Sequence, residues 1–142
     1  DAIQQQLSGA VPAQVFLWID IFAVNQHPGV DQAEDLNNLE AAIAVSSGTL
    51  VIMDSQGGPL MRVWCLLEIW STLRSKGREA LHLLNPGFDL KNVMIDIRQA
   101  SVTNPEDKVK ILQRIGGVDG AGIDELNLHL KLLFLLDPMD FK

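Results

Sequence analysis

Short apolar runs along the chain have the composition of buried strands. Residues 15–21 (VFLWIDI) and 49–53 (TLVIM) are rich in β-branched and aromatic side chains, and they lead to Asp20 and Asp54. A continuous apolar run without alternation is typical of a strand that is covered on both faces. A further strand is predicted over 80–84 (ALHLL), and residues 93–97 are a candidate fourth.

Helical patterns alternate with these runs. Residues 31–45 carry an apolar stripe at helical spacing, and residues 59–75 begin with a proline that suits the first position of a helix, with Gly77 at its end. An Asn-Pro-Glu-Asp start and a Gly-Gly end mark a helix over 104–117. Residues 126–136 alternate partly like a strand, but their leucine richness favours a helix.

This alternation predicts an α/β domain built on a parallel sheet. Ligands of such sheets bind beyond the carboxyl ends of the strands. Unusual polar residues follow the first two runs there: Asp20 with Asn25 and Gln26, and then residues 54–62. Asn25 and Gln26 are favoured as loop-stabilising residues, whereas Asp20 suits a loop cap or a ligand contact equally well.

Length and composition limit the kinds of protein that the chain can be. The 142 residues fit one domain over 1–142, and 47% apolar with 20% charged residues suffice for a core. A net charge of −7 argues against nucleic acid or an anionic membrane as partner, and no apolar run reaches the roughly 20 residues of a membrane span. A single cysteine excludes an internal disulfide and favours a reducing intracellular compartment, such as the cytoplasm.

The start of the chain has the pattern of an interrupted helix. Residues 1–7 place apolar side chains one turn apart before a Ser-Gly stop, and the first residue is not methionine. We therefore expect the sequence to be a piece of a longer protein.

The densest candidate chemistry lies in residues 62–70 (RVWCLLEIW). Glu68 is an acid within an almost wholly apolar helical segment, and Trp64 precedes it by one turn on the same face. Burial beside an indole disfavours the charged form of an acid, and such groups are candidates for function in clefts. The alternative is a structural carboxylate that accepts hydrogen bonds from the backbone or from Arg62, and composition alone favours it.

Two motifs carry a resemblance to known families. Residues 18–26 (WIDIFAVNQ) and the later Arg-x-Trp…Glu element in residues 62–68 resemble the two signatures of heterokaryon-incompatibility domains. Residues 64–68 (WCLLE) are also similar to a segment of Toll/interleukin receptor (TIR) domains, notably algal and plant-type ones. The resemblance covers residues 15–84, and residues 104–137 form a helical C-terminal part. It implies a flavodoxin-like parallel sheet with helices on both faces, here without its first βα unit.

The resemblance also implies two alternative functions. In catalytically active TIR domains this glutamate is the key residue for cleavage of the nicotinamide–ribose bond of NAD, which makes Glu68 the candidate catalytic carboxylate. Such a carboxylate can stabilise an oxocarbenium-like ribose. Asp20, Trp64 and Arg62 are then the candidate substrate-binding residues. Many relatives keep the fold as an assembly module, and the absent first unit favours that function: an interaction or scaffold domain with protein partners or self-association.

The remaining reactive side chains predict no further site. The three histidines, His27, His82 and His129, share no metal-ligand spacing with one another or with Cys65, so no metal site is expected. The Gly57-Gly58 pair lacks the fuller pattern of a phosphate-binding loop. We therefore expect no resident cofactor, and NAD would be a substrate.

Overall fold

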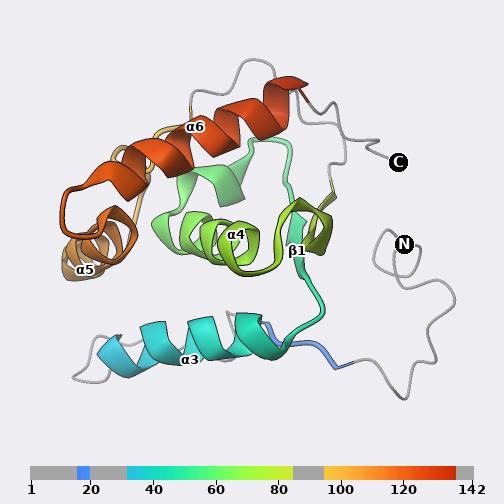
Figure 1. The fold of residues 1–142 in the computed structure, drawn as a ribbon, viewed down its shortest axis with the longest axis horizontal. Coiled ribbons are helices and arrows are strands. Elements are labelled where there is room, and N and C mark those ends of the chain that lie inside the picture. Colours follow the sequence, from blue (N-terminus) through green and yellow to red (C-terminus); the bar gives the residue numbers. More distant parts are fainter. Residues whose placement is uncertain (1–15, 20–31, 85–94, 137–142) are drawn as a thin grey trace, which may run out of the picture.

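The computed structural model describes residues 16–19, 32–84 and 95–136 (Figure 1). Within these ranges the chain is a mixed α/β structure. Its regular elements are, in order, α3 (Gln32–Val45), β1 (Thr49–Ile52), a 3₁₀ turn η2 (Gly58–Met61), α4 (Val63–Lys76), a 3₁₀ turn η3 (Arg78–Ala80), β2 (Leu81–Leu84), α5 (Pro105–Gly116) and α6 (Ala121–Leu136).

Strands β1 and β2 pair in parallel, as the alternating pattern predicts. The register runs from Thr49 opposite Leu81 to Ile52 opposite Leu84, and α4 is the crossover between the strands. The hydroxyls of Thr49 and Thr72 lie 2.6 Å apart, so the crossover helix is hydrogen-bonded to the strand that precedes it. The predicted strands at 49–53 and 80–84 and their parallel arrangement are thus confirmed.

Helix α4 lies at the centre of the core. It contacts α3, α5 and both strands, and in Figure 1 α3 and α6 lie on opposite sides of it. Its buried side chains are Val63, Leu66, Leu67, Ile69, Trp70 and Thr72. A helix buried on so much of its circumference is fixed by packing, and any functional side chain on it has a rigid support.

The ends of the helices follow local signals. The Asn104 side chain accepts a hydrogen bond from the Glu106 backbone N–H at 3.1 Å, which caps α5 as its sequence predicts. Gly77 ends α4 with a φ of 81°, a conformation that favours glycine. The helices predicted over 31–45 and 126–136 are confirmed as α3 and α6.

The predicted start of α4 at Pro59 is wrong, because the helix begins at Val63. Pro59 lies in the 3₁₀ turn η2, not in the helix, because Arg62 is extended with a φ of −113° and its neighbours pair with Ser101. The Ser101 N–H donates to the Met61 carbonyl at 2.7 Å, and the Val63 N–H donates to the Ser101 carbonyl at 3.0 Å. This pairing with a residue distant in sequence separates the turn from the helix.

The strands predicted over 15–21 and 93–97 are not found in their described parts, residues 16–19 and 95–97. Residues 16–19 form no strand and are exposed, with Phe16 at 91%, so they lack the burial on both faces that their apolar run predicts. Ile95 and Ile97 are buried, but they form no strand: a turn begins at Asp96, and the Ile97 N–H donates to the Asn127 side chain at 3.1 Å. The rest of both segments, Asp20 included, and the predicted helix over 1–7 lie outside the described residues.

Among the helices that the structure describes, none combines the length and apolar character needed to cross a bilayer.

Candidate functional site

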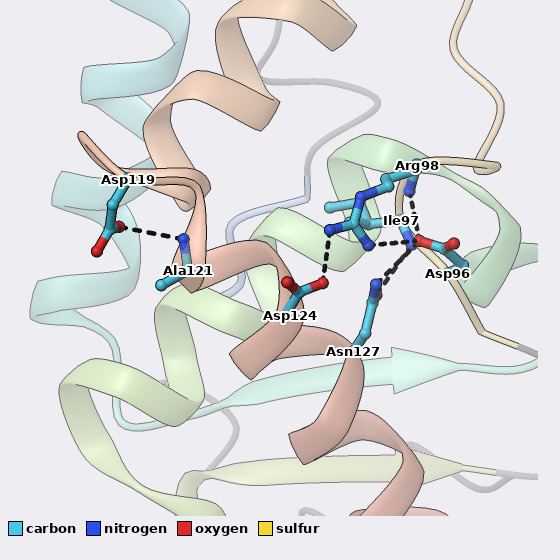
Figure 2. Close-up of polar contacts among 7 residues, drawn as sticks. All are labelled: Asp96, Ile97, Arg98, Asp119, Ala121, Asp124 and Asn127. Carbon is cyan, nitrogen blue, oxygen red and sulfur yellow. Dashed lines mark hydrogen bonds and ion pairs between the residues drawn. The ribbon is translucent and has the colours of Figure 1, made fainter.

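A polar network joins α6 to the turn at residues 95–99 (Figure 2). Its centre is Asn127, which is only 7% exposed and lies among buried leucines of α6. The Asn127 amide donates to Asp96 Oδ1 at 2.9 Å, while its carbonyl oxygen accepts from the Ile97 N–H at 3.1 Å. Because both halves of the amide are used, the turn is held at one position along the helix.

Arg98 extends this network to the surface. Its guanidinium donates to Asp124 Oδ1 at 2.5 Å and lies 3.6 Å from Asp96 Oδ1. The pKa of Arg98 is raised, first by the hydrogen bond to Asp124, and the pKa of Asp96 is lowered, first by the hydrogen bond from the Arg98 backbone N–H. Exposed ion pairs of this kind add little stability, so their main effect is to orient the charged groups.

A groove of about 260 Å³ lies over this network. The residues that define its chemistry are Asp96, Arg98, Asp124, Asn127, Leu128 and Lys131. Two carboxylates and two cations leave the groove without net charge, and no nucleophile lies among these side chains. The groove therefore combines balanced charges with an exposed leucine.

Helix α6 exposes two leucines among the polar residues of its outward side. Leu126 and Leu130 are fully buried, whereas Leu128 is 56% and Leu132 is 40% exposed. An amphipathic surface helix carries mainly polar residues on its outward face, so two exposed leucines one turn apart are a departure from that pattern. The two exposed leucines, together with Asp124 and Lys131 beside them, form what we call the α6 outer face.

The start of α6 is capped at a tight approach to α5. The Asp119 carboxylate accepts a hydrogen bond from the Ala121 N–H at 3.1 Å (Figure 2). A Cβ on Gly122 would lie 1.9 Å from the carbonyl oxygen of Ile115, so only glycine fits there. The α6 outer face is therefore set at a fixed position relative to α5.

Two of the candidate residues for NAD cleavage lie on α4, and a third, Arg62, lies just before the helix. Trp64 and Glu68 lie one turn apart on α4 and are both half-buried, between the buried Leu67 and Ile69. Arg62 precedes the helix and is exposed, so helical spacing does not bring its side chain to that face. The two cavities described for residues 32–84 and 95–136 are lined by other side chains.

The loop after β1 uses its aspartate to hold its own backbone. Asp54 Oδ1 accepts hydrogen bonds from the N–H groups of Gln56 at 2.8 Å and Gly58 at 2.9 Å. These bonds favour the charged form and lower the pKa of Asp54, with the bond from Gly58 as the largest cause. The carboxylate expected near a ligand at this strand end is a turn-forming group.

The α6 network was not predicted from the sequence, although one signal was present. Asn127 is a single amide between Leu126 and Leu128, and a polar residue at a buried helical position needs a partner. Its partners, however, are about thirty residues away and follow no motif. Within the described ranges, no three His, Cys, Asp or Glu side chains come together as a metal site requires.

Comparison of the chain with models of protein families, with curated proteins and with solved structures gave no match.

Proposed function

We propose that the chain is a TIR-like protein-interaction domain and that the α6 outer face is its contact surface. The observation that carries the proposal is the exposure of Leu128 and Leu132 on a helix whose opposite side is fully packed. The parallel β1–α4–β2 unit supports the flavodoxin-like fold that this family implies. The reducing cytoplasmic location stays a prediction from the single cysteine.

The charges beside the leucines favour a second copy of the same helix as the partner. Asp124 and Lys131 both line the groove along one side of α6, seven positions apart and with opposite charge. In an antiparallel pair of α6 helices, Lys131 of each copy would lie opposite Asp124 of the other. Leu128 lies near the midpoint of this spacing and would pack against its own equivalent.

Sedimentation of the purified protein over a range of concentrations tests this assignment. We expect reversible self-association that Leu128→Glu abolishes, because a carboxylate would be buried at the centre of the contact. The matched control is Val109→Glu, which adds the same charge at a residue of α5 with similar exposure, 57%. A protein that is monomeric throughout, or equal association of both variants, would contradict the proposal.

A charge exchange tests the antiparallel geometry separately. Lys131→Glu should weaken association because it places like charges opposite each other, and adding Asp124→Lys should restore it. The double variant also breaks the Asp124–Arg98 pair, so its thermal stability is measured in parallel. Failure of the double variant to recover association while it remains folded would refute this pairing.

NAD cleavage is the second candidate function, supported by the position of Glu68. Glu68 and Trp64 share one half-buried side of α4, so a carboxylate and an indole lie together on a rigid helix. The test is release of nicotinamide from NAD by the purified protein, compared with Glu68→Gln. Release that depends on Glu68 is expected if this function holds, and no release, or equal release by both proteins, excludes it.

A further inference from the structure

A second cavity, of about 350 Å³, lies between α3, α4 and α5. Its walls include Ile43 of α3, Leu67 and Trp70 of α4 and Ile115 of α5, which together form an apolar lining. Volumes of this order accommodate small organic ligands. The polar groups at its wall decide what kind of ligand would fit.

Arg74 is one of two arginines that line the cavity, and its side chain is exposed. Its guanidinium carbon lies 5.9 Å from the centre of the Trp70 ring, which is only 5% exposed and therefore fixed. Among the described residues no carboxylate forms an ion pair with Arg74. A guanidinium held over an aromatic ring keeps its N–H donors available at its edges.

The other arginine of the cavity, Arg114, is paired with a carboxylate. Arg114 donates from Nε to Glu40 Oε1 at 2.9 Å, and a second short bond joins its Nη2 to Glu40 Oε2. These bonds raise the pKa of Arg114, and the Glu40 carboxylate balances its charge. Among the described residues, Arg74 therefore has no carboxylate partner, whereas Arg114 has one.

Ser71 supplies a second donor one turn before Arg74. Its backbone carbonyl accepts a bond from the Ser75 hydroxyl at 2.6 Å, and its own hydroxyl has no partner among the described residues. Ser71 and Arg74 are three positions apart on α4 and both line the cavity, so their donors lie on one side of the helix.

We propose that this cavity binds a small organic anion, with Arg74 and Ser71 holding its oxyanion and the apolar walls holding its body. The fork of a guanidinium matches the paired oxygens of a carboxylate or a phosphate, and a hydroxyl donor fits beside it. The proposal goes beyond the interaction function, because the cavity is formed by α3, α4 and α5 and the α6 outer face contributes no residue to it.

Calorimetric titration of the purified protein with benzoate and with phenyl phosphate tests the proposal, and benzyl alcohol is the uncharged control. We expect at least one anion to bind and the alcohol not to bind. Arg74→Gln should weaken binding by about tenfold to a hundredfold, the usual range for a lost hydrogen bond to a charged group. Ser71→Ala should have a smaller effect in the same direction.

The control variant is Lys110→Gln, which removes a positive charge from α5 at a residue that does not line the cavity. It should bind as the unmodified protein does, and thermal melting of each variant verifies folding. Binding of only one anion identifies the oxyanion as a carboxylate or a phosphate and supports the site. Binding of neither anion, or equal weakening by Arg74→Gln and Lys110→Gln, would overturn the proposal.

Discussion

Replacement of Asn127 is the most informative perturbation of the α6 network. In Asn127→Ala the buried N–H of Ile97 loses its acceptor and the Asp96 carboxylate loses a donor. An unsatisfied buried donor costs about 1–3 kcal/mol and a lost bond to a partly solvated carboxylate about 1 kcal/mol, which gives a loss of about 2–4 kcal/mol. Against a typical unfolding free energy of about 5–15 kcal/mol, this is a large fraction.

Asn127→Asp separates the two bonds, because it keeps the acceptor for Ile97 and removes only the donor. At neutral pH a carboxylate replaces an amide that lies 2.9 Å from Asp96 Oδ1, and the repulsion raises the pKa of the coupled acids. Lowering the pH protonates one of them and restores an O–H donor. The stability of this variant relative to the unmodified protein should therefore increase as the pH falls from neutral towards the pKa of the pair.

Urea denaturation followed by circular dichroism at several pH values measures both effects. We expect a clear loss of stability for Asn127→Ala at all pH values and a deficit for Asn127→Asp that shrinks in acid. If Asn127→Ala lay within about 0.5 kcal/mol of the unmodified protein, the range of neutral surface changes, the amide would not have the role assigned to it. A pH-independent deficit for Asn127→Asp would refute the contact with Asp96.

Three further predictions concern packing and acid stability. Gly122→Ala should lower the thermal melting temperature, because the new Cβ would lie 1.9 Å from the Ile115 carbonyl oxygen. Overpacking of this kind typically costs about 1–3 kcal/mol. An unchanged melting temperature would contradict this close approach. Leu130→Ala should cost about 2–5 kcal/mol in urea denaturation, whereas Leu128→Ala on the outer face should change stability by less than about 0.5 kcal/mol. The pKa values of Asp54 and Asp96 are lowered in the folded state from the ordinary 3.8. Their contribution to the free energy of unfolding is therefore complete above about pH 4 and is lost as the pH falls through the lowered values. Asp54→Asn should flatten this acid dependence, which a pH titration of the unfolding free energy measures.

The sequence predicts the local elements well because their signals are local. The cap at Asn104, the end at Gly77 and the apolar run at 49–52 each depend on neighbouring residues, and the structure has them in place. The start of α4 depends on Ser101, which is far away in the chain, and no periodicity reveals that contact. The same reason explains why the described part of the candidate strand over 93–97 is not a strand: the Ile97 N–H donates to a side chain of α6 that is distant in the sequence.

Only those contacts of the candidate site that depend on helical spacing could be predicted from the sequence. The four-residue separation of Trp64 and Glu68 correctly places them on one side of α4, and their burial agrees with an apolar segment. The α6 network required knowledge of which turn packs against Asn127, which tertiary structure alone decides. Likewise, the sequence does not show that Glu40 pairs with Arg114 rather than with Arg74, because that choice depends on how α3, α4 and α5 pack.

The connection of β1 to β2 through α4 has a consequence for how the chain folds. A parallel ladder cannot form as a simple hairpin, so the two strands meet only when the crossover between them has compacted. We therefore expect α4 to belong to the folding nucleus, with substitutions at Leu66 or Ile69 slowing the refolding rate. Substitutions in α6, such as at Leu130, should chiefly accelerate unfolding, so the C-terminal helix would govern how long the native state persists.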